Sequence, residues 1–447
     1  MLLKKIVKAL TEKYLGDPGC VGITASTGLA AYNIAGTTLH RFAGIGIGKA
    51  PTEKLIKDIL KSGFIRRRWE AVEVLVIDEI SMINSTLFDK LDVIARAVRG
   101  VDLPFGGVQL VITGDFFQLP PVMQETGHDT PRFCFEASAW KQAIQHTISL
   151  TRIYRQRDPL FTKMLNEIRE GRPSAHTIEN FRKLSRPLES FADKGPEATE
   201  LYPLRREADL ANARRMQKIK GPIFTYAATS GGIIEDAATR QRLLNDCIAP
   251  EILELKQGAQ VILTKNIDDI LVNGSQGRVV GFANSETFFH SRWDDEDHEL
   301  DPSTLLTGSM EDAPEQRPPL FPVVRFLLED GSTRVELCGP KGWAVERWVP
   351  DPWEDSGWKV EKLATRTQVP LLPAWALSIH KAQGQTLDRV KVDLDRIFEM
   401  GQAYVALSRA TTMDGLQVLN FNPDKIVVHP KVKRFYASLS KSRNSGE

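Results

Sequence analysis

Short apolar runs alternate with stretches of helical spacing along the first half of the chain. Apolar positions over residues 2–15 recur at helical spacing and stop at Gly16-Asp17-Pro18-Gly19. Residues 74–77 and 108–113 have the length and composition of buried strands, and an amphipathic helix is predicted between them over 87–98. Strands that alternate with helices predict a parallel α/β sheet, which carries its ligand sites at the carboxyl ends of its strands.

The pattern changes twice in the second half. A second α/β block is predicted from about residue 150, with a helix over 160–169 and a strand over 259–263. From about 283 to 366 the chain is rich in proline and tryptophan, which predicts a small β-rich domain inserted in the second block. The α/β pattern resumes after Pro370.

Composition and charge narrow the class of protein. The 447 residues are 42% hydrophobic and 26% charged, which is typical of globular domains, and no apolar run approaches the ~18 residues of a membrane span. The four cysteines form no CxxC pair, which argues against a zinc ribbon and fits a reducing compartment. Residues 283–360 hold 17 acidic and 7 basic side chains although the whole chain has a net charge of +1, so the remaining body is basic and suits a polyanionic partner.

The strongest local pattern is an apolar strand that ends in two carboxylates. Residues 74–77 are followed by Asp78 and Glu79. Mg²⁺ prefers oxygen ligands and keeps part of its hydration shell, so Asp78 would hold Mg²⁺ at the strand tip. Glu79 would then polarise an attacking water. The same string also fits a strand that merely ends in an acidic turn.

A glycine turn after the next strand favours a nucleotide site over a simple acidic turn at the end of the first strand. Residues 114–121 contain Gln118, which would sense a γ-phosphate by hydrogen bonding without adding charge, and two prolines that stiffen the exit. Arg155 and Arg409 stand in favourable strings, because a planar guanidinium matches the charge that phosphoryl transfer spreads over the γ-oxygens. Such an arginine finger is worth roughly 10³–10⁵ in rate.

Taken together, these strings resemble the petite-integration-frequency family of DNA helicases, a 5′-to-3′ branch of helicase superfamily one. Seven stretches match the family in order along nearly the whole chain, and the acidic insertion matches least well. They are 24–31 (motif Ia), 76–82 (II), the family signature within 89–109, 114–122 (III), 150–156 (IV), 378–387 (V) and 401–411 (VI).

The resemblance implies an α/β fold with two RecA-like parallel-sheet domains and a small β-rich, SH3-like insertion in the second. The implied units are a first core domain at 1–149 with a wedge-like element at about 42–68, a second core domain at 150–282 and 367–436, the acidic insertion at 283–366, and a tail at 437–447.

Functional residues of the family carry over only onto matching positions. The implied catalytic residues are Asp78, which also binds the metal, Glu79, Gln118, Arg155 and Arg409, and the residues that line the ATP cleft are Gln383, Gly384 and Gln402. The implied DNA-binding residues are Ser26, Thr27, His40 and Phe42 in the first domain, and His380 and Lys381 in the second. Backbone contacts and stacking suit translocation that does not read sequence, and stacking on Phe42 would supply about 1–3 kcal/mol, although a core phenylalanine fits the pattern equally well.

The implied activity is ATP-dependent 5′-to-3′ unwinding of DNA with ATP and Mg²⁺ as cofactors. The implied partners are single-stranded DNA, forked duplexes, RNA–DNA hybrids and G-quadruplex structures, with no membrane partner. The family acts in genome maintenance (replication, repair, recombination, telomeres) in the nucleus and the mitochondrion. We expect a monomer, or a dimer on DNA.

One departure from the family pattern concerns its phosphate-binding loop, GxxxxGK[ST], which this sequence does not contain. The stretch 43–50 imitates it, but Ala43 and Ala50 replace the first glycine and the metal-binding hydroxyl, so we reject Lys49 as the phosphate lysine. Two explanations stay open: a copy of an active helicase that begins after this loop, or a product that binds DNA without hydrolysing ATP. We expect phosphate release near background from the 447-residue chain, and robust DNA-stimulated release would contradict this.

Two other classes of protein remain open at this stage. A non-hydrolysing protein that binds single-stranded DNA would crosslink to DNA but not to azido-ATP. An ATPase that remodels proteins would not require the strings at 24–31 and 378–387, and filter binding to an oligonucleotide would exclude it.

Overall fold

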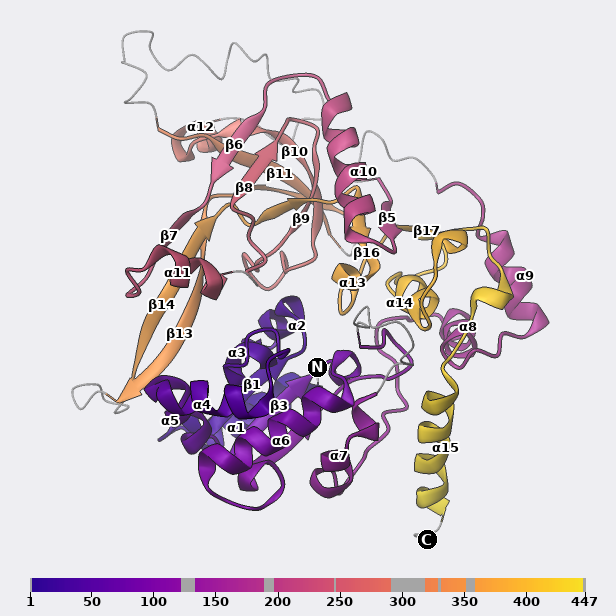
Figure 1. The fold of residues 1–447 in the computed structure, drawn as a ribbon. Coiled ribbons are helices and arrows are strands. Elements are labelled where there is room, and N and C mark those ends of the chain that lie inside the picture. The colour runs from indigo at the N-terminus through magenta and orange to yellow at the C-terminus, as the bar shows by residue number, and fades with distance from the viewer. Residues whose placement is uncertain are drawn as a thin grey trace.

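The computed structural model describes residues 2–121, 133–188, 197–244, 247–290, 318–328, 331–350 and 358–444. Within these ranges the chain forms two lobes with parallel sheets and a β-rich unit that extends from the second lobe over the first (Figure 1). None of the described helices has the length and apolar character that a membrane crossing requires.

The first lobe is built on a parallel sheet with the strand order β2-β1-β3-β4. Its strands are β1 (Val21–Ala25), β2 (Thr37–Thr38), β3 (Val74–Asp78) and β4 (Gln109–Ile112). Its helices are α1 (Leu2–Lys13), α2 (Gly28–Asn33), α3 (Leu39–Ala43), α4 (Thr52–Lys61), α5 (Gly63–Ala71), α6 (Ser85–Arg99) and α7 (Ser138–Ala143). The predicted strands and helices of this half are thus present in the predicted order.

Helix α6 shows why these elements form where they do. The Asn84 side chain accepts from the Leu87 N–H at 2.7 Å and caps the first turn, and Gly100 ends the helix with a φ of 67°. The apolar face between them is buried, and Leu91 and Ile94 are both 0% exposed in the same core as the β3 side chains.

The second lobe has a parallel sheet with the strand order β16-β5-β17-β18. Its strands are β5 (Thr199–Tyr202), β16 (Ala376–Ser378), β17 (Val390–Asp393) and β18 (Leu416–Leu419). Its helices are α8 (Pro159–Arg169), α9 (Ala175–Lys183), α10 (Arg205–Lys218), α13 (Ile379–Ala382) and α14 (Gln402–Leu407).

The β-rich unit is larger than the insertion predicted at 283–366. Its strands are β6 (Phe224–Ala227), β7 (Thr229–Gly231), β8 (Ile252–Leu255), β9 (Gln260–Leu263), β10 (Gln276–Ala283), β11 (Phe321–Leu327), β12 (Thr333–Leu337), β13 (Lys341–Pro350), β14 (Trp358–Gln368) and β15 (Leu371–Pro373), and its helices are α11 (Ala237–Leu244) and α12 (Ser285–His290). The strand predicted at 259–263 forms, but it pairs antiparallel with β10 and β15 and not with the second lobe's sheet. A boundary at 283 would separate β10 from β11, its partner in the same sheet.

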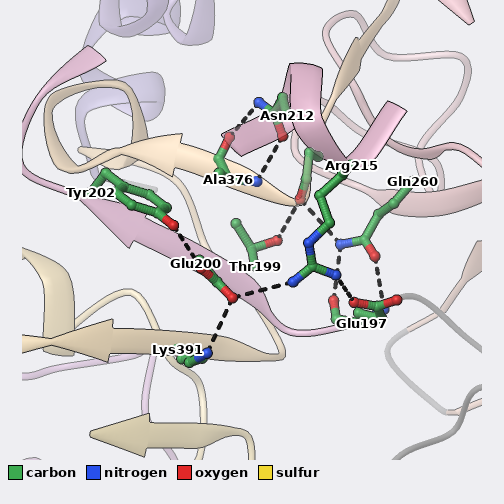
Figure 2. A network of polar contacts seen from close by, with 10 residues as sticks. Glu197, Thr199, Glu200, Tyr202, Asn212, Arg215, Gln260, Ala376 and Lys391 are labelled. Carbon is green, nitrogen blue, oxygen red and sulfur yellow. Dashed lines mark hydrogen bonds and ion pairs between the residues drawn. The ribbon is translucent and has the colours of Figure 1, made fainter. Parts of the chain in front are cut away.

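A buried polar network joins this unit to the second lobe (Figure 2). Gln260 on β9 is 0% exposed, accepts from the Glu197 N–H at 2.8 Å and donates to the Ala374 carbonyl at 3.1 Å. Asn212 on α10 makes a matching pair of hydrogen bonds, at 2.8 and 2.9 Å, with the carbonyl and N–H of Ala376. Gln260 thus ties β9 of the unit to the segments that precede β5 and β16, whereas Asn212 holds α10 against β16 within the second lobe.

The last helix, α15 (Pro430–Asn444), crosses back to the first lobe. Val428 and Val432 belong to the same hydrophobic core as β3 and α6, and Phe435 stacks on Phe135 at 4.4 Å. The sequence analysis assigns residues up to 436 to the second lobe and the remainder to a tail. The structure instead continues the helix through Asn444 and packs its first half against the first lobe, where Val432, Phe435 and Tyr436 bury apolar surface.

Candidate nucleotide and nucleic-acid site

Two carboxylates stand at the carboxyl end of β3. The Asp78 Oδ1 accepts a hydrogen bond from the Thr113 hydroxyl, beyond the end of β4, and another from the Glu79 N–H at 2.9 Å. Glu79 has a φ of 53°, which is uncommon for a residue with a side chain and is concentrated at functional sites. The ends of two neighbouring strands therefore orient the Asp78 carboxylate.

Glu79 is contacted directly by the second lobe. Gln383 Nε2 donates to Glu79 Oε2 at 3.0 Å, across 304 positions of sequence. Gly384 follows with a φ of 79°, and a Cβ there would stand 4.0 Å from Glu79 Oε1. Burial raises the pKa of Glu79 and the charge of Asp78 raises it further, while the Gln383 hydrogen bond acts against both. The structure thus brings the predicted acidic residues and two predicted cleft residues together.

Both predicted arginines lie in the second lobe beside this contact. Arg409 is 2% exposed and donates to the Val405 carbonyl at 2.8 Å and the Gln385 carbonyl at 3.2 Å. Burial, together with the charge of the nearby Arg155, lowers the pKa of Arg409 to about 9, although the charge of Glu79 acts in the opposite direction. Burial also lowers the pKa of Arg155. Among the described residues no ion pair joins either guanidinium to a carboxylate, so the buried Arg409 and the partly buried Arg155 together favour an anionic ligand.

Four glutamines in the strings at 114–122, 378–387 and 401–411 carry buried amide atoms that find no hydrogen-bond partner in the part of the chain that the structure describes. The atoms are Gln118 Oε1, Gln383 Oε1, Gln385 Oε1 and Gln402 Nε2. The opposite amide atom of Gln402 is engaged, because its Oε1 accepts from the Phe398 N–H at 3.3 Å. A buried polar group without a partner costs about 1–3 kcal/mol. Gln383 contacts Glu79 and Gln385 contacts Arg409, so unpaired polar atoms beside these two residues favour a polar ligand there.

Loop 43–50, the imitation of a phosphate-binding loop, has the wrong polarity for phosphate. Lys90 Nζ on α6 donates to the carbonyls of Gly48 and Ala50, both at 3.0 Å, and Lys49 is exposed. Carbonyl oxygens attract cations, whereas a phosphate cradle needs converging N–H donors. This geometry supports the rejection of Lys49, and it explains the loop as an anchor for α6.

A second set of polar side chains follows the ends of β1 and β2. Ser26 donates its N–H to the Asp78 carbonyl at 3.1 Å, and Thr27 Oγ1 accepts from the Ala30 N–H at 3.2 Å to cap α2. The hydroxyls of Ser26 and Thr38 are buried, and no described residue pairs with either. Thr38 is absent from the sequence prediction. Thr38 could have been found from strand pairing, because it lies opposite Ala25, which precedes Ser26 at the end of the neighbouring strand.

The prediction that Phe42 stacks on a nucleic-acid base needs correction in this conformation. Phe42 is 5% exposed and meets the Trp69 ring edge-on at 5.6 Å, and a Cβ on Gly22 would fall 2.7 Å from its ring. The core phenylalanine that the sequence left open is the arrangement found. His40 lies two residues earlier on α3 and is partly exposed.

His380 and Lys381 lie on the short helix α13, whose first turn is capped by Ser378 at 3.3 Å. His380 Nε2 stands 3.7 Å from a carboxylate oxygen of Glu399, and burial lowers the pKa of His380. Burial also lowers the pKa of Lys381, and the charge of Arg205 at the start of α10 lowers it further. The charges of Lys381 and Arg205 therefore gather at this edge of the second lobe, where they would attract a polyanion.

The described residues fit part of a site for ATP with Mg²⁺, the cofactor pair that the family resemblance implies, although the sequence does not contain the GxxxxGK[ST] loop that would cradle the phosphates. Glu79 acts electrostatically on Arg155 and Arg409 and accepts from Gln383, so these groups lie beside the acidic strand end. Within the described ranges no group of three or more His, Cys, Asp or Glu side chains could hold a metal by itself. Mg²⁺ typically binds through one or two carboxylates together with phosphate oxygens and water, so Asp78 is sufficient as the protein ligand.

Fold and site together define a class: a protein with two RecA-like lobes of the helicase type, whose acidic strand end in one lobe faces arginines in the other. A PIF1-like helicase family model matches residues 1–179, and a model described as DNA helicase Pif1, 2B domain, matches residues 240–282, within the β-rich unit. The chain belongs to the PIF1-like helicase family.

Individual relatives agree with this assignment. The chain is 49% identical to the ATP-dependent DNA helicase PIF1 of Emericella nidulans over 98% of its own length and 59% of the relative's. It is similar to the crystal structure of Pif1 helicase from Candida albicans, with 44% identity, a TM-score of 0.73, and coverage of 98% of this chain and 92% of that one. It is also similar to Bacteroides Pif1 bound to single-stranded DNA, with 26% identity, a TM-score of 0.57, and coverage of 99% and 92%. The chain spans about three fifths of the length of the curated relative.

Proposed function

We propose that this chain carries the motor core of an ATP-dependent DNA helicase. The observation that carries the proposal is the hydrogen bond between Glu79 and Gln383, which joins the acidic strand end to the other lobe beside two buried arginines. Because this hydrogen bond joins the two lobes where the nucleotide would bind, the distance between the lobes would depend on whether a nucleotide occupies the cleft. Such dependence is what a motor needs in order to move along a strand.

The chain's own residues have distinct parts in the proposed cycle. Bound ATP with Mg²⁺ supplies a phosphoanhydride bond and a metal that offsets its charge. Asp78 would hold the metal, and Glu79 would accept a proton from the attacking water, since burial raises its pKa. Gln118 would hydrogen-bond the γ-phosphate, and Arg155 and Arg409 would stabilise the charge that develops on it. Gln383, Gly384 and Gln402 would line the cleft.

The finer parts of the proposal come from the family resemblance. We propose 5′-to-3′ movement on single-stranded DNA, with forked duplexes, RNA–DNA hybrids or G-quadruplex structures as substrates. The relative solved with single-stranded DNA supports the first of these partners. Genome maintenance in the nucleus and the mitochondrion is the corresponding role.

Single-stranded DNA would bind between Ser26, Thr27 and Thr38 on the first lobe and His380 and Lys381 on the second. Substituting Lys381→Ala is expected to weaken binding of a labelled oligothymidine about fivefold near 0.1 M salt and to reduce the slope of log affinity against log salt by about 0.7, because one phosphate contact is lost. Fluorescence anisotropy at several salt concentrations measures both quantities.

Lys183→Ala is the matched control for Lys381→Ala. Lys183 lies on α9 and pairs with Glu179 at 2.8 Å, and both side chains are about two-thirds exposed, so its loss removes the same charge from another surface. Equal effects of the two variants on the salt slope would show that Lys381 is not a phosphate contact and would contradict the proposed DNA-binding face.

A single-stranded DNA-binding protein without ATP turnover is the second candidate function. The unpaired hydroxyls of Ser26 and Thr38 favour it, because they lie on a face that needs no nucleotide to form. Photo-crosslinking separates the two candidates. A motor core labels with both azido-ATP and an oligonucleotide, whereas a pure binding protein labels with the oligonucleotide alone.

A further inference from the structure

The turn that carries Gln118 belongs to both lobes at once. It begins beyond β4 of the first lobe, and Phe116 and Phe117 are buried in that lobe's core. Leu119, one residue after Gln118, is 0% exposed in the core of the second lobe. A movement between the lobes therefore acts on this short stretch, which we call the sensor turn (residues 114–119), a name that rests on the proposed function.

An arginine from the second lobe holds the start of the sensor turn. Arg169, at the last position of α8, donates from Nε and Nη2 to the two carboxylate oxygens of Asp115, both at 2.8 Å. Burial would lower the pKa of Arg169, but the hydrogen bonds and charge of Asp115 prevail and raise it above its usual value. The Arg169 and Asp115 side chains are 25% and 17% exposed. A half-buried bidentate pair of this kind restrains orientation as well as distance.

A tyrosine from the returning helix α15 completes the arrangement. The Tyr436 hydroxyl donates to Asp115 Oδ1 at 3.1 Å and accepts from the Phe116 N–H at 3.2 Å. Its ring stacks on the Phe117 ring with 4.5 Å between the ring centres. The Arg169 guanidinium also lies over the Phe117 ring, 4.3 Å from its centre. Charge, hydroxyl and ring contacts thus converge on consecutive residues of the turn.

We propose that Arg169 and Tyr436 are positioning residues that place Gln118 for its γ-phosphate contact according to where the second lobe lies. They touch neither the acidic strand end nor the buried arginines. Both act through Asp115 and its neighbours, three residues or fewer from Gln118. The ion pair with Arg169 fixes the start of the turn when the lobes are together, and separation of the lobes would break it. Tyr436 holds the same turn from α15, which packs on the first lobe.

The test follows amide hydrogen exchange of the sensor turn in the full chain, without DNA or nucleotide. Tyr436→Phe keeps the ring stack but removes the acceptor of the Phe116 N–H. Arg169→Lys keeps the charge but cannot make two parallel bonds. Each variant is expected to speed exchange of the Phe116 and Gln118 amides at least about fivefold, while the melting temperature stays within about 2 °C of the parent's.

Lys431→Ala is the matched control for the sensor-turn variants. Lys431 also ties α15 to the first lobe, through Glu136 at 2.7 Å, but it does not touch the turn. Its exchange at 116–118 should equal the parent's. Two outcomes would overturn the inference: all three variants change exchange at the turn to the same extent, or exchange changes only in step with the melting temperature. In either case the residues only stabilise the packing of α15. No oligonucleotide enters this measurement, so a failure of the DNA-binding prediction is a separate result.

Discussion

Replacing Gly401 by alanine is expected to open the contact between the two lobes. Gly401 caps α14 with a φ of 81°, and a Cβ there would lie 2.7 Å from the Phe117 carbonyl oxygen and closer still to that of Gln118. A left-handed residue with a side chain costs about 1–3 kcal/mol, and overpacking costs about as much again. We expect the free energy that keeps the sensor turn closed to fall by about 2–4 kcal/mol. The opening constant of the turn, measured by hydrogen exchange, should then rise at least about 30-fold.

Gly100→Ala provides the control for this substitution. Gly100 ends α6 with a similar φ of 67°, but a Cβ there meets nothing within 4 Å. This substitution should therefore destabilise the protein only through left-handed backbone strain, by about 1 kcal/mol. Hydrogen exchange in the sensor turn should stay unchanged. If Gly401→Ala leaves the turn as protected as Gly100→Ala does, the two lobes do not press on each other at this point.

Trp69→Ala is expected to destabilise the first lobe by about 3–5 kcal/mol. Trp69 on α5 is 0% exposed, its Nε1 donates to the Ala43 carbonyl at 3.2 Å, and its ring meets Phe42 edge-on. Removing it leaves a large cavity between α3 and α5, and α5 overlaps the end of the wedge-like element proposed at about 42–68. Exchange of the β1 and β3 amides during a urea titration would measure the loss of stability in this lobe.

Two further variants make the Trp69 result specific. Trp69→Phe keeps most of the ring volume and loses the hydrogen bond, so about 1–2 kcal/mol of destabilisation is expected. Val93→Ala changes a side chain of the same lobe that is 47% exposed, and it should stay within about 0.5 kcal/mol of the parent. A Trp69→Ala chain that is as stable as Val93→Ala would show that α5 is not held by this side chain.

Much of the candidate site follows from patterns within short stretches. The four apolar residues before Asp78 and Glu79 predict a buried strand with carboxylates at its tip, and the structure has that strand. Parallel strands end at a common edge, so the placement of Thr113 beside Asp78 is also within reach of the sequence. Such patterns do not show whether the arginines are buried or which groups they hydrogen-bond. Arg409 donates to carbonyls of its own lobe, because burial leaves those groups no water to pair with.

Errors in the prediction arise where a strand or helix has several possible partners. The short apolar run of β9 is buried at every position and fits a parallel or an antiparallel sheet, and only its pairing with β10 and β15 decides between them. Phe42 has the same sequence context whether it faces a ligand or Trp69, and the close approach permitted by Gly22 decides for the core. Each outcome depends on a surface contributed by a distant part of the chain.

The sequence by itself determined the order of strands and helices, the acidic strand tip, the glycine turn with Gln118 and membership of a helicase family, because each is encoded in neighbouring residues. Only the tertiary structure decided that Gln383 meets Glu79, that α15 returns to the first lobe and that Arg169 holds Asp115. These contacts join residues 54 to 321 positions apart. They form because burial and charge pairing favour one arrangement of complete lobes, which no local pattern specifies.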